Sequence, residues 1–163
     1  MKIKNVVTSS ELGDRKKDIV VWGSSYVTGI EVIDMQHREL VVLTNNLYHA
    51  CLAGKEDVVG PVFKKTMDSL VKYVREHFSA EQVLLEKIGF PGYRDHKKLH
   101  DELIIQIVDA AKEYGQGRKF TPNHFVRTLK DWIFGHIAVN DKIYSAYVKE
   151  QVKKGHLKRE DLC

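Results

Sequence analysis

The sequence predicts an all-α protein: an up-down-up-down antiparallel four-helix bundle that follows an N-terminal extended arm. The chain of 163 residues is long enough for one domain with a sizeable hydrophobic core. Apolar residues recur every three to four positions along four long stretches, which is the period of an amphipathic α-helix. Only three prolines interrupt the chain, and the segments between the stretches are short, as in bundles of antiparallel neighbours.

The ends of the four helices can be placed from their capping residues. Asp34 is a suitable N-cap for the first helix, and Pro61 and Pro122 suit the first turns of the second and fourth. The expected helices are residues 35–52, 61–88, 94–114 and 122–153. An extended segment rich in β-branched and aromatic residues precedes them. The predicted organisation is a polar arm (1–20), a bundle (21–153) and a basic tail (154–163).

Composition excludes several classes of function. The net charge is +4, and much of the excess lies in the C-terminal tail and near Arg15–Lys17. These charges do not form a dense basic stripe with interleaved aromatic residues, so we expect no nucleic-acid partner. No apolar run is long enough to span a membrane, and the polar start lacks the apolar region of a signal peptide. We therefore expect a cytoplasmic protein with no membrane partner.

Seven side chains of metal-binding type lie on the predicted inner faces, with at least one on every helix. They are His37, His77, Glu81, His96, His100, His136 and Asp141. The second and third helices each present a pair spaced by four residues, which is one turn and one face. Burial of so many polar groups without a metal would be costly. Five imidazoles and two carboxylates are too many for one ion, so we expect two ions. Nitrogen and oxygen ligands without thiolates suit iron or manganese, and also zinc.

The spacing of His136 and Asp141 is unusual for two ligands of one site. Residues five apart lie about 140° apart around a regular α-helix. Both side chains can face the same site if the helix widens locally into a π-type turn, which is common at functional sites. We therefore predict an i→i+5 irregularity between about Gly135 and Tyr144.

In this order and spacing, the seven residues resemble the ligand pattern of the hemerythrin family, in particular of its bacterial members. The pattern is a lone histidine followed by H-x-x-x-E, H-x-x-x-H and H-x-x-x-x-D. The sequence around the first histidine is also similar to the family's start, with Trp22, Tyr26, Gly29, Ile33, Asp34, Gln36 and Leu40 at matching positions. The resemblance covers roughly residues 21–152.

The resemblance implies a site with two non-heme iron ions joined by an oxo or hydroxo bridge. Three histidines would bind one iron: His96, His100 and His136. His37 and His77 would bind the other iron and leave it an open position. Glu81 and Asp141 would bridge the pair. Dioxygen would bind reversibly at the open iron, with nitric oxide and small anions as further candidate ligands.

Four further residues match the positions that line the family's dioxygen pocket: Phe78, Trp132, Ile133 and Ile137. The same four residues would also be expected in the ordinary hydrophobic core of a helix bundle. Ile133 stands where a leucine is common in the family, and its β-branched side chain is stiffer.

The leading hypothesis is a non-enzymatic protein that binds dioxygen for delivery, storage or sensing. One alternative is a di-iron enzyme that reduces peroxide or nitric oxide, which needs a proton donor near the open iron. No acid, histidine or lysine stands among the four pocket residues, although Tyr73 and Tyr144 are near ligands in sequence. Another alternative is a metal-dependent signalling module.

Overall fold

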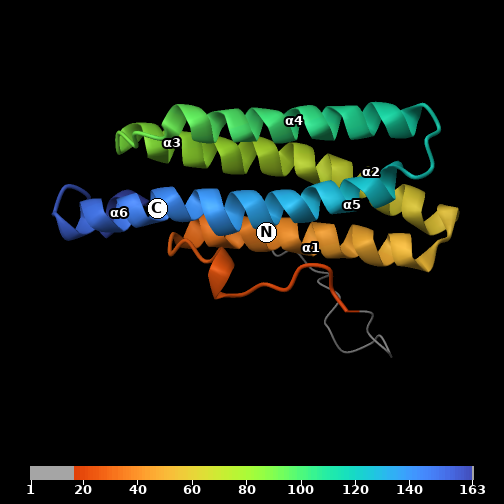
Figure 1. Cartoon of the computed structure of the whole chain (residues 1–163), viewed down its shortest axis with the longest axis horizontal. Coiled ribbons are helices and arrows are strands. Elements are labelled where there is room, and N and C mark those ends of the chain that lie inside the picture. Colours follow the sequence, from red (N-terminus) through yellow and green to blue (C-terminus); the bar gives the residue numbers. More distant parts are fainter. Residues whose placement is uncertain (1–16, 163) are drawn as a thin grey trace, which may run out of the picture.

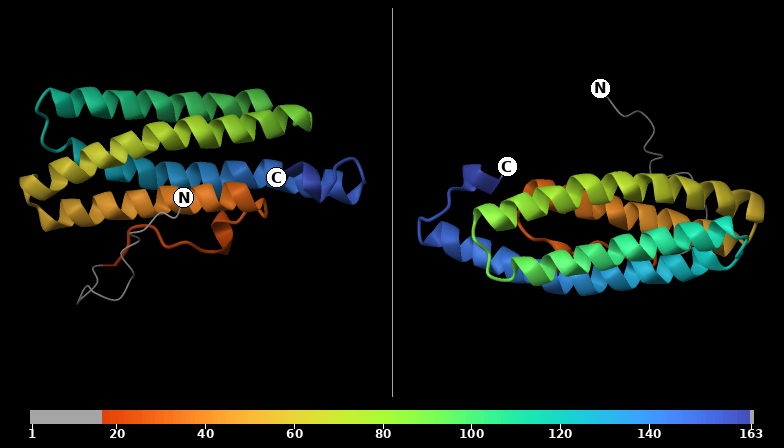
Figure 2. Two further views of the ribbon diagram at one scale, coloured as in Figure 1. Left: turned by 180° about the vertical axis from the view of Figure 1, so that it is seen from behind. Right: turned by 90° about the horizontal axis from the view of Figure 1, so that it is seen from above.

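The computed structural model describes residues 17–162, and every regular element within them is a helix (Figure 1). The helices form four long helical rods, numbered in chain order. The first rod is α1 (Glu31–Ala53), and the third is α4 (Tyr93–Gly115). The second rod joins α2 (Glu56–Tyr73), the π-helical η2 (Val74–Phe78) and α3 (Ser79–Lys87). The fourth joins α5 (Thr121–Trp132), the π-helical η3 (Ile133–Asn140) and α6 (Asp141–Lys153). Figure 2 shows the four rods side by side, which confirms the predicted antiparallel bundle.

The prediction that Asp34 caps the first helix is wrong, because α1 begins at Glu31. The Asp34 carboxylate instead accepts hydrogen bonds from the backbone N–H groups of Thr28 and Gly29, at 2.7 and 3.0 Å, and from the Thr28 hydroxyl at 2.8 Å. Asp34 therefore fixes the loop before the helix rather than the first helical N–H groups. Its negative charge in the first turn still suits the positive end of the helix.

The prediction that Pro61 lies in the first turn of the second helix is also wrong. α2 begins at Glu56, and Pro61 lies inside it. Glu56 and Asp57 place two negative charges in the first turn, where the helix dipole stabilises them. The helix therefore begins five residues earlier, at Glu56, than the position of Pro61 had indicated.

The segment before α1 runs along the outside of the bundle (Figure 1). It is not helical apart from η1 (Ser24–Tyr26), as expected for an extended segment. The side-chain amide of Asn45 on α1 accepts from Val20 N–H at 3.0 Å and donates to Val20 C=O at 2.8 Å. Val20 is thereby buried against the bundle. Residues 1–16 of the predicted arm lie outside the described part of the chain.

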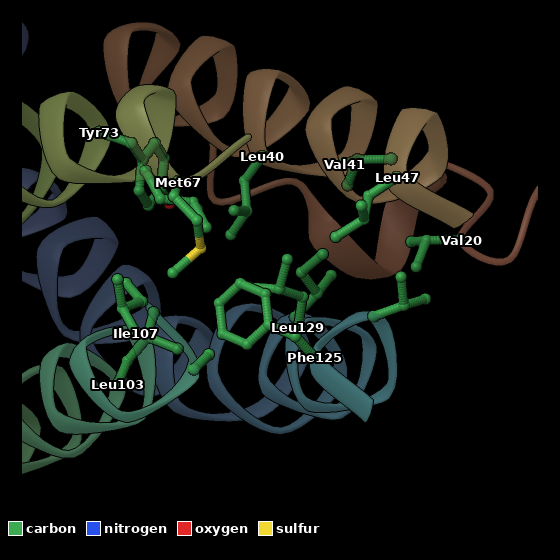
Figure 3. Packing of buried hydrophobic residues seen from close by; sticks show 14 of the residues in the cluster. Val20, Leu40, Val41, Leu47, Met67, Tyr73, Leu103, Ile107, Phe125 and Leu129 are labelled. Atoms are coloured by element: carbon green, nitrogen blue, oxygen red, sulfur yellow. The ribbon is translucent and has the colours of Figure 1, made fainter. Parts of the chain in front are cut away.

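The apolar core consists of two clusters. The larger cluster lines the middle and the far end of the bundle, and Figure 3 shows ten of its residues labelled. The smaller lies at the end where α3 meets α4 and includes Ile33, Leu84 and Tyr144. Among residues 17–162, no helix has the length and apolar character needed to cross a membrane.

Candidate metal centre

The structure brings all seven candidate ligands together between the two apolar clusters. Every one of the four rods contributes, as the sequence predicts. Exposure is 0% for His37, His77, Glu81, His100 and Asp141, 3% for His136 and 5% for His96. Chemical groups of this polarity are buried at such a depth when they are paired or coordinate a metal.

One part of the centre combines Glu81 with three imidazoles. The Oε2 atom of Glu81 lies 3.1 Å from His100 Nε2 and 3.2 Å from His96 Nε2. His100 Nε2 lies 3.0 Å from His136 Nε2. Two ligands that bind one ion at right angles, each about 2.1 Å away, are themselves about 3.0 Å apart. The spacing is therefore suited to a shared ion.

A second part combines His37, His77 and the same glutamate, whose Oε2 lies 3.7 Å from His77 Nε2. Asp141 connects both parts. Its Oδ2 lies 3.1 Å from His37 Nε2, and its Oδ1 lies 3.1 Å from His136 Nε2. Each carboxylate therefore faces imidazoles of both parts, as two bridging ligands would.

The unpaired polar atoms of the centre fit a metal. Both oxygens of Asp141 and the Nε2 atoms of His37 and His77 are buried without a hydrogen-bond partner among residues 17–162. Several Nε2 and carboxylate atoms approach one another closely without the alignment of a hydrogen bond. Unpaired donors and acceptors that converge in this way are stabilised when a cation lies between them.

The helix geometry explains how His136 and Asp141 face the same site. η3 is a π-helix over Ile133–Asn140, which confirms the predicted i→i+5 irregularity. The Asn140 side-chain amide donates to Gly135 C=O at 2.8 Å, so it satisfies one carbonyl of the widened turn. A second π-helix, η2, was not predicted. It allows the adjacent residues His77 and Phe78 both to be buried.

Two residues outside the predicted set hold candidate ligands in place. His77 Nδ1 lies 2.8 Å from Gln36 Oε1, an acceptor, so Nδ1 carries the proton and Nε2 presents its lone pair to the centre. The Tyr144 hydroxyl donates to Glu81 Oε1 and leaves Oε2 to face the imidazoles. Gln36 and Tyr144 carry no spacing signal of their own, so sequence reasoning gave them no such role.

Burial keeps four of the imidazoles neutral. It lowers the pKa of His37 to about 4 and that of His77 to about 3. It also lowers the pKa of His100, and it lowers the pKa of His136 well below the ordinary value. These four side chains are therefore uncharged at neutral pH, with one ring nitrogen free of a proton, which is the form that binds a metal.

The two carboxylates differ in charge. Burial, and next the negative charge of Glu81, raise the pKa of Asp141 well above its ordinary value. Burial opposes ionisation of Glu81 too, but His77 and the hydrogen-bonding His100 hold the pKa of Glu81 well below its usual range. Glu81 is therefore the more acidic of the two carboxyl groups, whereas burial beside Glu81 opposes a negative charge on Asp141.

These shifts predict that acid destabilises the metal-free protein. Between pH 6.5 and about 4, the unfolded chain protonates His37 and His77 while the folded chain does not, so the free energy of unfolding falls as pH decreases. From pH 7 to pH 5 we expect the free energy of unfolding to fall by on the order of 2 kcal/mol for each of these two imidazoles. Asp141 partly offsets this fall, because its raised pKa favours the folded state as the pH decreases. Urea denaturation of the metal-free protein at both pH values measures it. Equal or greater stability at pH 5 would contradict the predicted direction.

Two of the four candidate pocket residues stack on imidazoles of the centre, and the other two are buried in the larger apolar cluster. The Phe78 ring stacks on His100 with centroids 3.7 Å apart, and the Trp132 ring stacks on His136 at 4.2 Å. Ile133 and Ile137 are fully buried in the larger apolar cluster. Aromatic and branched aliphatic side chains therefore cover this side of the centre.

Comparison with known proteins agrees with this architecture. A family model described as "Hemerythrin HHE cation binding domain" matches residues 28–148, which include all seven converging residues. A bacteriohemerythrin of Pseudomonas aeruginosa is 33% identical over 148 residues, which cover 86% of this chain and 94% of that protein. A bacteriohemerythrin of Stenotrophomonas maltophilia is 31% identical over 137 residues, with coverages of 83% and 86%.

A structural comparison gives the same result. The crystal structure of a hemerythrin mutant has a TM-score of 0.66 to this chain at 27% identity, and the match covers 80% of this chain and 97% of that one. The matched domain, the relatives and the shared fold together show that the chain belongs to the hemerythrin family.

Proposed function

We propose that this protein binds two non-heme iron ions and uses them to bind dioxygen reversibly. The observation that carries the proposal is the convergence of seven buried candidate ligands. Six of them form two sets that share Glu81, and the seventh, Asp141, faces both sets. A single-ion site has no use for so many ligands, whereas a pair of ions with a common bridge uses all of them. The names of the bacterial relatives support the choice of chemistry.

The ligands divide by their positions. His96, His100 and His136 would hold one iron together with Glu81, and His37 and His77 would hold the other. Asp141 would bridge them, because its two oxygens face His37 and His136. The second set has one imidazole fewer, so it leaves a coordination position for a ligand. When bound, the iron pair would supply the electrons that dioxygen takes up on binding and would take them back when dioxygen leaves.

The chain's own residues prepare this site. Gln36 holds His77 in the tautomer that presents Nε2. Tyr144 holds Glu81 in one orientation. Apolar side chains, among them Phe78, Ile133 and Ile137, exclude water and its protons from the interior, which protects a bound ligand from release in reduced form.

The structure gives less support to the alternative of a peroxide or nitric oxide reductase. Such an enzyme needs a group that gives up a proton beside the ligand. The two buried phenols near the site hold their protons firmly, because burial raises the pKa of Tyr73 and of Tyr144 well above the ordinary value. We therefore propose a carrier, store or sensor rather than an enzyme, located in the cytoplasm.

The deciding experiment uses protein reduced anaerobically after loading with iron. We expect dioxygen to produce a visible charge-transfer spectrum that disappears when the gas is removed and returns when it is readmitted. The same cycle on Glu81→Ala protein, which lacks the shared ligand, is expected to give no such spectrum. Immediate and irreversible oxidation of the wild-type protein, with release of peroxide, would contradict the proposal.

A further inference from the structure

The hydroxyl group of Tyr73 is buried without a hydrogen-bond partner. The residue is 5% exposed, and its hydroxyl oxygen contacts no donor or acceptor among residues 17–162 at hydrogen-bond geometry. A buried hydroxyl that is left unpaired costs free energy, so such groups are rare in folded proteins and indicate a further role. Phenylalanine would fill nearly the same space in an apolar cluster without this cost.

Tyr73 lies directly beside the candidate ligands. It precedes His77 by one helical turn, and its ring stacks on the His77 imidazole with centroids 4.7 Å apart and an interplanar angle of 24°. Its ring also meets Phe78 edge-on at 6.1 Å. Figure 3 shows Tyr73 and Met67 directed into the interior of the bundle, where Leu40 enters from α1. The phenol therefore adjoins the ligand set that has the open position.

On the side away from the centre, Tyr73 belongs to the larger apolar cluster. Each of the other rods has an apolar residue of this cluster about one turn from a candidate ligand. These residues are Leu40, which follows His37, Leu103, which follows His100, and Ile133, which precedes His136. Because neighbouring rods are antiparallel, these positions lie on the same side of the centre as Tyr73. A hydrogen-bond donor placed in such a layer acts strongly, since the local dielectric is low.

Tyr144 provides a comparison within the same centre. Tyr144 is also buried, but its hydroxyl donates a hydrogen bond to Glu81. The Tyr144 side chain belongs to the smaller apolar cluster, on the other side of the centre. One phenol therefore holds a ligand of the centre, whereas the other keeps its donor unused. Simple filling of the core does not explain the difference, because both side chains are packed.

We propose that the Tyr73 hydroxyl is a hydrogen-bond donor to the small ligand that binds on the His37–His77 side of the centre. It selects ligands whose outer atom carries negative charge and accepts a hydrogen bond. This inference rests on the proposed function, because it needs a loaded centre with one open position. The role is that of binding and positioning the ligand.

The test compares azide binding to oxidised, iron-loaded wild-type and Tyr73→Phe protein. Azide is a small anion that a buried donor recognises. We expect Tyr73→Phe to weaken azide binding about tenfold or more, as measured by optical titration, at unchanged iron content. The metal-free Tyr73→Phe protein is expected to resist urea at least as well as the wild type, because the change removes an unpaired buried hydroxyl. The infrared stretch of bound azide is expected to shift between H₂O and D₂O in the wild type and not in the variant.

Tyr114→Phe is the matched control, because it removes the same atom near the C-terminal end of α4 and should leave azide affinity unchanged. Incorporation of 3-fluorotyrosine at position 73 strengthens the donor and should tighten azide binding, which tests the role even if Tyr73→Phe folds poorly. Equal azide affinity in wild type and Tyr73→Phe overturns this inference alone. Wild-type protein that loads no iron, or that binds neither azide nor dioxygen, overturns the proposed function and this inference with it.

Discussion

Replacement of His77 by alanine is expected to abolish dioxygen and azide binding while one ion remains bound. Among the described residues, His77 is one of two imidazoles in the proposed set with the open position. The set of His96, His100, His136 and Glu81 is complete without it. We therefore expect the iron content to fall from about two ions per chain to about one, and azide affinity to fall by at least about 100-fold. Metal analysis and optical titration on the same sample measure both.

His49→Ala is the matched control for this substitution. His49 lies on the outer part of α1, where its Nε2 is 2.7 Å from Asp18 Oδ1. The same change of residue type at this position should leave iron content and azide binding unaffected. If the His77→Ala protein still bound dioxygen, the division of ligands between the two ions would be incorrect.

Loading with iron is expected to raise the melting temperature by roughly 15–30 °C over the metal-free protein. The folded chain presents preformed ligands, whereas the unfolded chain scatters them, so each bound ion stabilises the folded state. At free metal concentrations about 1,000 times the dissociation constant, each ion contributes about 4 kcal/mol. In a domain of this size, 1 kcal/mol corresponds to about 2–4 °C.

Calorimetry with iron and with a strong chelator measures this difference. Glu81→Ala is the informative comparison, because Glu81 belongs to both ligand sets and its loss should remove most of the increase. A melting temperature that is the same with and without bound iron would mean that the unfolded chain holds the ions as firmly as the folded one.

The sequence predicted the bundle and the ligand set because both depend on helical periodicity. Spacings of four place His77 with Glu81 and His96 with His100 on single faces, and no long-range information is needed to recognise them. The spacing of five between His136 and Asp141 predicted the π-helix of η3 for the same reason. The structure brings all these residues together as the pattern indicates.

The remaining features depend on contacts that a pattern does not contain. Asp34 is an ordinary N-cap residue by type, yet its carboxylate binds the preceding loop, because Thr28 and Gly29 fold back towards it. The bond of Gln36 to His77 joins residues 41 positions apart, and that of Tyr144 to Glu81 joins residues 63 apart. Local propensity carries no information about such pairs.

The π-helices have a consequence for how the two ends of the bundle are related. Along the last rod, the buried residues Leu129, Ile133 and His136 follow one another at steps of four and three. The candidate ligand Asp141 follows His136 at a step of five, and the buried residues Tyr144 and Val148 continue at steps of three and four. One residue turns a regular α-helix by about 100°, so an extra residue would rotate everything after it by that amount. The wider turns of η3 absorb the extra residue, so Asp141 and the buried positions after it still face the interior.

A second π-helical turn, η2, occurs in the rod that runs parallel to it. α1 and α4 pass the layer of candidate ligands as uninterrupted α-helices. Removing one residue from η3 would bring His136 and Asp141 to a spacing of four, which a regular α-helix also places on one face. Such a deletion would therefore keep the direction of the apolar face beyond the candidate ligands and remove only the widened turn itself.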